Sequence, residues 1–329
     1  EKIAALFDVR IGLADTDGER VRFLQDQAQV FETEIGDPAR ALDALRRAFE
    51  MDPRDEAIAS DLERLAPQCE GGWEPLRGLV EKVLEAGGDD FDGMLVRDLN
   101  MRAARWYRDH LGDAEAAEAR YRGAIAADQD AQEAHEQLVE LLRVPGREKA
   151  LVAALVQWAD VDYDEEAKKA RLTEAAALAE SAFQETALAI RCYEKILEVD
   201  AGHASSLDQL CRLEAAAGNH ERVCDLLETR VEVEMDPDAR LELRKQLAGT
   251  YAALERVTDA IDAWRGALDE VPDDLDAIGA LEELYAKTER WSELEELVQR
   301  RLEVASTPEE SIAARGKAFI VNHKGEMIA

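Results

Sequence analysis

The chain has 329 residues, of which 47% are hydrophobic and 5% aromatic, and its formal net charge is −33 at pH 7. So acidic a surface argues against nucleic acid and anionic membrane surfaces as partners, because both need basic patches. It favours basic partners, solubility or adaptation to salt. With only 8 prolines and 19 glycines, nearly all of the chain can be helical.

The N-terminal segment 1–17 predicts the last helix of a preceding repeat. Four of its apolar positions match positions in the segment 292–311, with Ile3, Leu6, Ile11 and Leu13 corresponding to Leu294, Leu297, Leu302 and Val304. We therefore expect the chain to open inside a repeat and to be a fragment of a longer protein. No signal peptide is visible, and no apolar run reaches the roughly 18–20 residues of a spanning helix. We expect a cytoplasmic location and no membrane insertion.

The first full unit, 18–89, reads as four helical segments. The first carries Leu24, Ala28, Phe31 and Ile35 on one face, with steps of three and four residues, and Gly36–Pro38 ends it. The second segment ends at 51–53, the third carries a leucine pair, and the fourth is expected to start at Trp73.

Three further units, 90–163, 164–236 and 237–308, repeat this order. A small residue recurs at Ala41, Ala117, Ala189 and Ala260, at steps of 76, 72 and 71 residues. A large apolar residue follows four positions later each time, at Leu45, Tyr121, Tyr193 and Trp264. Such a period with helical spacing inside it predicts one continuous solenoid of stacked helices. The segment 309–329 is expected to be a partial or atypical C-terminal helix.

The half-units identify the family that the chain resembles. The stretch 241–272 resembles a tetratricopeptide repeat through Leu247, Ala248, Tyr251, Ala260, Trp264, Ala267 and Pro272. The copy at 24–53 matches with one extra residue before Gly36, and the second half of each unit matches less well. The resemblance covers about residues 18–308 and implies an all-α, right-handed α-solenoid of antiparallel helix pairs, with about 17–18 helices in tandem double units.

In this family the first helix of each pair lines the inner, concave wall, and carrying that geometry over nominates ten residues for binding a partner. They are Arg22, Gln25, Gln29, Met101, Arg105, Arg108, Thr173, Glu180, Glu242 and Lys245. The Lys and Asn pattern with which some family members hold carboxylate termini is missing at these places. Arg97, Arg102, Arg105 and Arg108 form a local basic cluster, which either recognises a carboxylate or pairs with Asp98, Asp109, Asp113 and neighbouring acidic helices.

No constellation of residues predicts chemistry. The five histidines follow no HxxxH or HExxH pattern, and the four cysteines form no CxxC pair, so we expect no catalytic residue, no cofactor and no metal. We expect the cysteines to be free thiols in a reducing compartment, with Cys211 and Cys224 on consecutive helices. Trp73 and Trp291 share one repeat position, which favours packing over ligand stacking.

Three functions fit these observations. The first is a non-catalytic scaffold that binds a protein or peptide partner, a basic one in view of the charge. The second is a regulatory array in a larger enzyme such as a protein kinase. The third is self-assembly into a homo-oligomer through the apolar ends of the solenoid.

Overall fold

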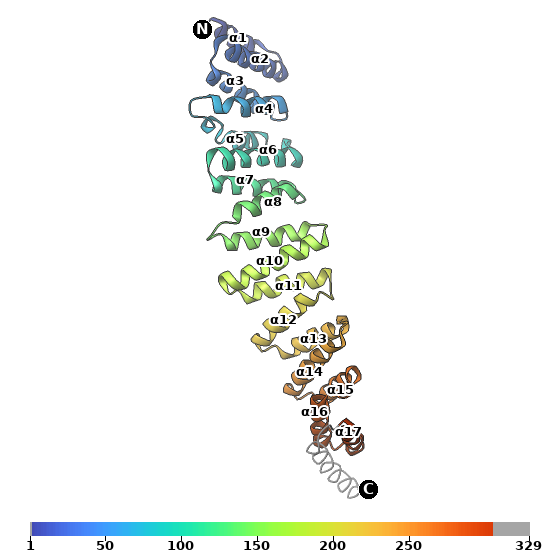
Figure 1. Ribbon diagram of the computed structural model, residues 1–329. Coiled ribbons are helices and arrows are strands. Elements are labelled where there is room, and N and C mark those ends of the chain that lie inside the picture. Colours follow the sequence, from blue (N-terminus) through green and yellow to red (C-terminus); the bar gives the residue numbers. More distant parts are fainter. Residues whose placement is uncertain (1, 305–329) are drawn as a thin grey trace. The chain divides into compact units, whose positions relative to one another are not determined.

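The structure is a computed structural model that describes residues 2–304, and these form seventeen α-helices and no strand. The expected all-α fold and helix number are thereby confirmed. The predicted C-terminal element 309–329 and His323 lie outside the described residues. The chain forms two compact units that divide between Ala167 and Lys168, and successive helices within each unit stack as antiparallel neighbours (Figure 1).

The first compact unit holds nine helices. They are α1 (Lys2–Leu13), α2 (Asp17–Val30), α3 (Pro38–Met51), α4 (Glu56–Leu65), α5 (Leu79–Gly87), α6 (Gly93–Arg105), α7 (Ala114–Ala127), α8 (Gln132–Leu142) and α9 (Glu148–Val161). α10 (Glu165–Phe183) starts just before the division. The second compact unit continues with α11 (Thr186–Val199), α12 (Ala204–Ala217), α13 (His220–Val233), α14 (Pro237–Ala253), α15 (Val257–Glu270), α16 (Leu275–Lys287) and α17 (Trp291–Val304).

Helix starts follow from side-chain caps. Asp37 accepts a hydrogen bond from the Arg40 amide at the start of α3, where Pro38 takes the first helical position, and Asp113 does the same for α7. Asp92 and Asp274 cap α6 and α16 in the same way. These aspartates accept hydrogen bonds from amides that would otherwise lack a partner, and they thereby fix where the helices start.

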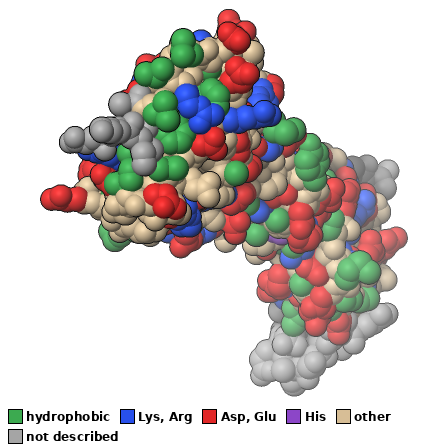
Figure 2. Space-filling model, turned by 90° about the horizontal axis from the view of Figure 1, so that it is seen from above, with side chains coloured by type: hydrophobic (Ala, Val, Ile, Leu, Met, Phe, Trp, Pro, Cys, Tyr) green, Lys and Arg blue, Asp and Glu red, His purple; other side chains and the backbone are tan. Residues whose placement is uncertain are grey.

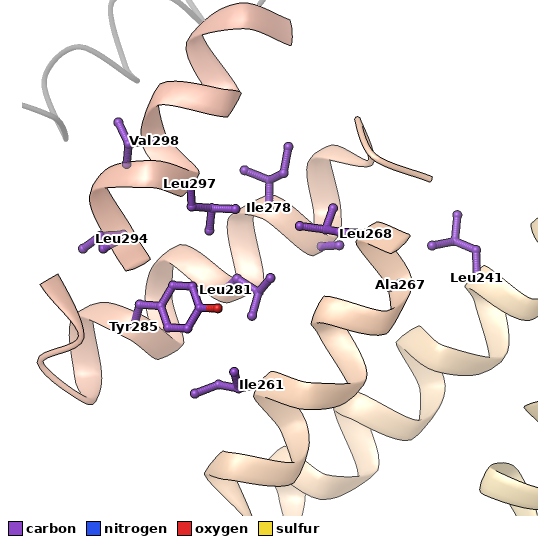
Figure 3. Close-up of a cluster of buried hydrophobic side chains, with 11 residues drawn as sticks. Leu241, Ile261, Ala267, Leu268, Ile278, Leu281, Tyr285, Leu294, Leu297 and Val298 are labelled. Atoms are coloured by element: carbon purple, nitrogen blue, oxygen red, sulfur yellow. The ribbon is translucent and has the colours of Figure 1, made fainter. Parts of the chain in front are cut away.

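The small and large residues of the repeat form the core. Ala41, Ala117, Ala189 and Ala260 are completely buried, and Tyr121 is buried with them. A small side chain lets paired helices approach closely, and the large one fills the space between neighbouring pairs. Figure 3 shows the cluster at α15, α16 and α17, where Ile261, Leu281 and Leu297 converge.

The extra residue predicted before Gly36 is absorbed in a π-helical turn, Phe31–Ile35, at the end of α2. A second π-helical turn, Trp106–Leu111, ends α6 in the same way. Both turns stop at a glycine in the left-handed conformation, Gly36 and Gly112. A π-turn holds one more residue than an α-turn, so the buried face keeps its register despite the insertion.

The prediction of a fourth helix starting at Trp73 is wrong. Residues 66–78 form short 3₁₀ turns (Ala66–Gln68 and Glu74–Leu76), and α5 starts only at Leu79. Gly71, Gly72 and Gly78 all have positive φ, which a right-handed helix does not allow. Trp73 packs by stacking on the ring of His110, with 3.8 Å between ring centroids, whereas Trp291 packs on the α16–α17 core.

Candidate functional site

Two hollows flank α6 and together form what we call the α6 furrow. The first, of about 390 Å³, lies between the start of α4 and α6 and is lined by Arg54, Glu56, Met94, Asp98 and Arg102, among others. The second, of about 430 Å³, lies between α6 and the start of α8. Its lining includes Arg97, Met101, Arg105, Asp130 and Glu133. Both hollows lie beside first helices of pairs, where the resemblance placed the binding wall.

The candidates on α2 lie outside the α6 furrow. Arg22 and Gln29 are exposed, and Gln25 is partly buried. The Gln25 amide donates to the Asp55 carboxylate over 3.1 Å. Gln25 therefore ties α2 to the cap of α4, and only Arg22 and Gln29 present free surface.

Met101 is not the surface residue that the sequence predicted. Its side chain is 6% exposed and forms part of the floor of the second hollow. Arg105 is exposed and pairs with Glu133 on α8, with 2.9 Å between nitrogen and oxygen. Arg108, in the π-turn, pairs with Asp109 over 2.6 Å and donates to Gln137. The floor is therefore apolar, and the rim consists of side chains that already have partners.

The arginine cluster is neutralised within the protein. Arg97 pairs with Asp98 and with Asp128, each over 2.8 Å. Arg102 pairs with Glu56 over 2.6 Å and approaches Glu63 at 3.4 Å. Ion pairing, rather than recognition of a carboxylate ligand, thus accounts for the cluster. Of the partners expected from the sequence, Asp113 instead pairs with Arg77 over 2.8 Å.

These ion pairs shift the pKa values of the side chains that form them. The hydrogen bond from Arg97 lowers the pKa of the Asp128 carboxyl, and the bonds from Asp128 and Asp98 raise the pKa of Arg97. Hydrogen bonding to Arg108 lowers the pKa of Asp109. The carboxyls of Asp128 and Asp109 therefore stay ionised at neutral pH, and Asp128 contributes a fixed negative charge to the rim of the furrow.

Of the candidate residues in the second compact unit, Glu242 borders a hollow, and the others are engaged in ion pairs or in a hydrogen bond within their own helix. A hollow of about 670 Å³ lies between α12 and α14, floored by Val223 and Leu227 of α13 and bordered by Glu242. Glu180 pairs with Arg212 over 2.5 Å. The Thr173 hydroxyl donates to the carbonyl of Lys169 and is committed to its own helix.

Lys245 is mostly buried and pairs with Asp274 over 2.7 Å and with Asp276 over 3.2 Å. Asp274 caps α16, just as Asp55 caps α4, so Lys245–Asp274 and Gln25–Asp55 are the same contact in two repeats. The sequence reasoning missed this link between the first and third helices of a unit. The signal was present in the sequence, as a polar residue placed 29 or 30 positions before a capping aspartate.

The chemistry of the remaining candidates is limited. None of the four cysteines, all within residues 2–304, forms a disulfide. Cys211 lies on α12 and Cys224 on α13, consecutive helices as predicted, and Cys211 packs against the cluster that contains Cys224. Burial raises the pKa of each of these two thiols to about 11. Within residues 2–304 no group of His, Cys, Asp and Glu side chains is arranged to hold a metal. No helix in that range is long and apolar enough to cross a membrane.

In the comparison with known proteins, similarity is found to solved structures alone. No family model matches the chain, and no curated protein matches it. Among solved structures, YrrB, titled a TPR protein with an unusual peptide-binding site, is 16% identical with a TM-score of 0.30, over 61% of this chain and 96% of that one.

Two further solved structures give similar values. A MamA fragment from Desulfovibrio magneticus RS-1 is 15% identical with a TM-score of 0.31, over 53% of this chain and 94% of that one. The Naa15/Naa10 structure bound to HypK-THB is 18% identical with a TM-score of 0.34, over 86% of this chain and 42% of that one. Neither a family nor a function is taken from these neighbours.

Proposed function

We propose that this chain is a non-catalytic interaction scaffold that binds a basic segment of a partner protein along the α6 furrow. The observation that carries the proposal is the charge balance of the furrow. Every arginine that borders it already has a carboxylate partner, whereas the carboxylates outnumber the arginines. A Lys or Arg side chain from outside therefore meets negative charge there.

The exposure of these carboxylates supports the binding of a basic segment. The side chain of Glu56 is 76% exposed, that of Glu133 is 61% exposed, and Asp130 is exposed as well. Figure 2 shows acidic side chains spread over the surface in view and interrupted by hydrophobic ones. Exposed charges of one sign accelerate the encounter with an oppositely charged partner. Met94 and Leu95 offer apolar contact in the first hollow, beside Glu56.

The test uses a fluorescein-labelled peptide of alternating Lys and Ser, with binding followed by anisotropy. We expect affinity to fall steeply between ~50 mM and ~500 mM NaCl, because salt screens exposed charges. The double variant Asp130→Asn, Glu133→Gln should weaken binding several-fold at low salt.

The matched control is Asp276→Asn, Glu293→Gln, which removes two charges from the second compact unit and should leave the affinity nearly unchanged. Equal loss in both variants would mean that the net charge of the molecule attracts the peptide and that the α6 furrow is no site. A substrate turned over by the purified chain would contradict the non-catalytic part of the proposal.

A further inference from the structure

The hollow between α12 and α14, which we call the α12–α14 hollow, is larger than its counterpart in the first compact unit. The counterpart, between α4 and α6, measures about 390 Å³ and extends along α6 as far as Arg102. The α12–α14 hollow measures about 670 Å³ and continues one turn further along its helix, from Gln246, which corresponds to Arg102, to Thr250. The additional space therefore lies at one defined place in the repeat.

In α6 a tryptophan occupies that place. Trp106 lies fourteen residues after Asp92, the cap of α6, and Thr250 lies fourteen residues after Asp236, the cap of α14. The side chain of Trp106 is only 4% exposed, and its indole nitrogen donates to the Glu63 carboxylate of α4 over 3.0 Å. An indole thus fills the space between the two helices in the first compact unit, and Thr250 leaves that space open in the second.

The facing helix is also smaller at this place. Cys211 of α12 directly follows the buried Leu210, just as Glu63 of α4 directly follows the buried Leu62. Cys211 and Thr250 both line the α12–α14 hollow. A short pair of side chains therefore stands where the first compact unit has a hydrogen-bonded indole and carboxylate.

The interior of the α12–α14 hollow is apolar. Val223 and Leu227 of α13 form its floor and are almost completely buried, and Leu243 of α14 forms a wall. Concave sites lined by apolar side chains with a few polar groups are typical of ligand pockets, and aromatic rings bury the most apolar surface in such sites.

The charge that remains available at the rim is negative. Arg212 and Arg230 border the hollow, and each already pairs with a carboxylate, over 2.5 Å and 3.0 Å respectively. Glu242 on the opposite rim is 65% exposed, and its pair with Lys245 is long, at 3.6 Å. That lysine approaches Asp274 more closely, at 2.7 Å. A cation from outside therefore finds an accessible carboxylate in Glu242.

We infer that the α12–α14 hollow binds an aromatic side chain of a partner protein, with a Lys or Arg next to it in the partner's sequence. The ring takes the place that Trp106 takes in the first compact unit, and the cation meets Glu242. This site is separate from the α6 furrow, so either proposal can fail without the other.

The experiment compares two fluorescein-labelled peptides, Ser-Lys-Trp-Lys-Ser and the same peptide with Ala in place of Trp, by anisotropy. We expect the wild type to bind the Trp peptide about tenfold more tightly, because the ring is an anchor in an apolar hollow. Thr250→Trp supplies the side chain that α6 has at this place and should abolish the preference. Thr250→Val keeps the hollow open, is the matched control and should keep the preference.

Protection of Cys211 locates the bound peptide on the wild-type protein. This thiol is partly exposed and lines the α12–α14 hollow. Saturating Trp peptide should slow its alkylation by N-ethylmaleimide, followed by mass spectrometry, and leave the alkylation of Cys69 unchanged, because Cys69 is a partly exposed thiol of the first compact unit. This measurement decides the question even where Thr250→Trp does not fold, which circular dichroism checks.

Three results would overturn the inference: equal affinity of the wild type for the two peptides, a preference for Trp that persists in Thr250→Trp, or unchanged alkylation of Cys211. N-acetyltryptophanamide should compete only weakly, and competition as strong as that of the Trp peptide would mean that the hollow takes a small aromatic ligand instead. Glu242→Gln should weaken binding of the Trp peptide about twofold at low salt, and equal affinity would overturn the basic residue beside the ring. The Asp130→Asn, Glu133→Gln variant of the α6 furrow should leave the preference for Trp unchanged.

Discussion

At the scale of residues, two glycines on second helices lie against polar side chains of first helices. A Cβ added at Gly123 would meet Asn100, and one added at Gly266 would meet Arg244. In the other two units the glycine position holds Arg47 or Lys195 and the polar position holds Leu24 or Leu172. The glycines are thus needed for the close approach of a neighbouring side chain.

Gly123→Ala should lower the free energy of unfolding by about 1–3 kcal/mol, because the added Cβ would lie 2.6 Å from Oδ1 of the buried Asn100. Gly249→Ala is the control, because its Cβ would meet nothing within 4 Å in the middle of α14. It should raise stability by about 0.5–1 kcal/mol. Urea denaturation measures both, and equal effects at the two sites would contradict this assignment.

The turn after the first helix of each unit places one residue in the left-handed conformation. The repeat-equivalent residues are Gly36, Gly112, Gln184 and Glu255, with φ of 71°, 63°, 54° and 58°. Gln184 and Glu255 are strained there, since only glycine adopts this conformation without a Cβ clash.

Glu255→Gly should therefore stabilise the protein by about 0.5–1 kcal/mol, as relief of strain exceeds the added freedom of the unfolded chain. Gly218→Ala is the reverse case, with φ of 79° and open space around the added Cβ. It should destabilise by about 1 kcal/mol. Thermal denaturation measures the stability of both variants, and a loss of stability in Glu255→Gly would refute the strain assigned to Glu255.

At the scale of elements, ion pairs join the first helix of a unit to the end of its second helix or the start of its third. Arg97 reaches Asp128 after α7, Lys169 reaches Asp200 after α11 over 3.2 Å, and Lys245 reaches Asp274 before α16. The cation lowers the pKa of Asp128 and of Asp200. Arg97–Asp128 and Lys169–Asp200 occupy one repeat position, and Lys245–Asp274 occupies the position of Gln25–Asp55. These recurring contacts hold the helices of a unit in place relative to one another.

Asp128→Asn should cost about 0.5 kcal/mol at pH 7, a small value because the side chain is about one-third exposed. Because the pKa of Asp128 is lower folded than unfolded, the wild-type advantage is present above the unfolded pKa of about 3.9 and is lost as pH falls through the folded one. The two proteins should unfold alike below pH ~3. A difference in stability between wild type and Asp128→Asn that persists at that pH would show that the effect is not ionic. The control is Asp43→Asn, because Asp43 forms only a weak ion pair of 3.5 Å with Arg46.

At the scale of the whole molecule, repulsion arising from the net charge of −33 opposes folding more strongly than the ion pairs favour it. The ion pairs are mostly solvent-exposed and individually weak, whereas carboxylates in excess of cations repel one another throughout the chain.

Raising NaCl from ~10 mM to ~200 mM should therefore raise the unfolding temperature by a few degrees, because salt screens the excess repulsion more than it weakens the pairs. Differential scanning calorimetry measures this. Sucrose, an uncharged stabiliser, serves as the control for general solvent effects. A lower unfolding temperature at higher salt would mean that the ion-pair network outweighs the repulsion.

The sequence by itself determined the helices, their order and the buried seam, because helical periodicity, capping aspartates and the small–large spacing act over a few neighbouring residues. It also showed the arginine cluster, of which Arg97, Arg102 and Arg105 lie on α6 and Arg108 in the π-helical turn that follows. Only the tertiary structure decided which charges remain available, since Arg105 and Lys245 find carboxylates 28 and 29 positions away. It alone buried Met101 and turned residues 66–78 into a loop held by Trp73, because each outcome depends on which side chains pack alongside.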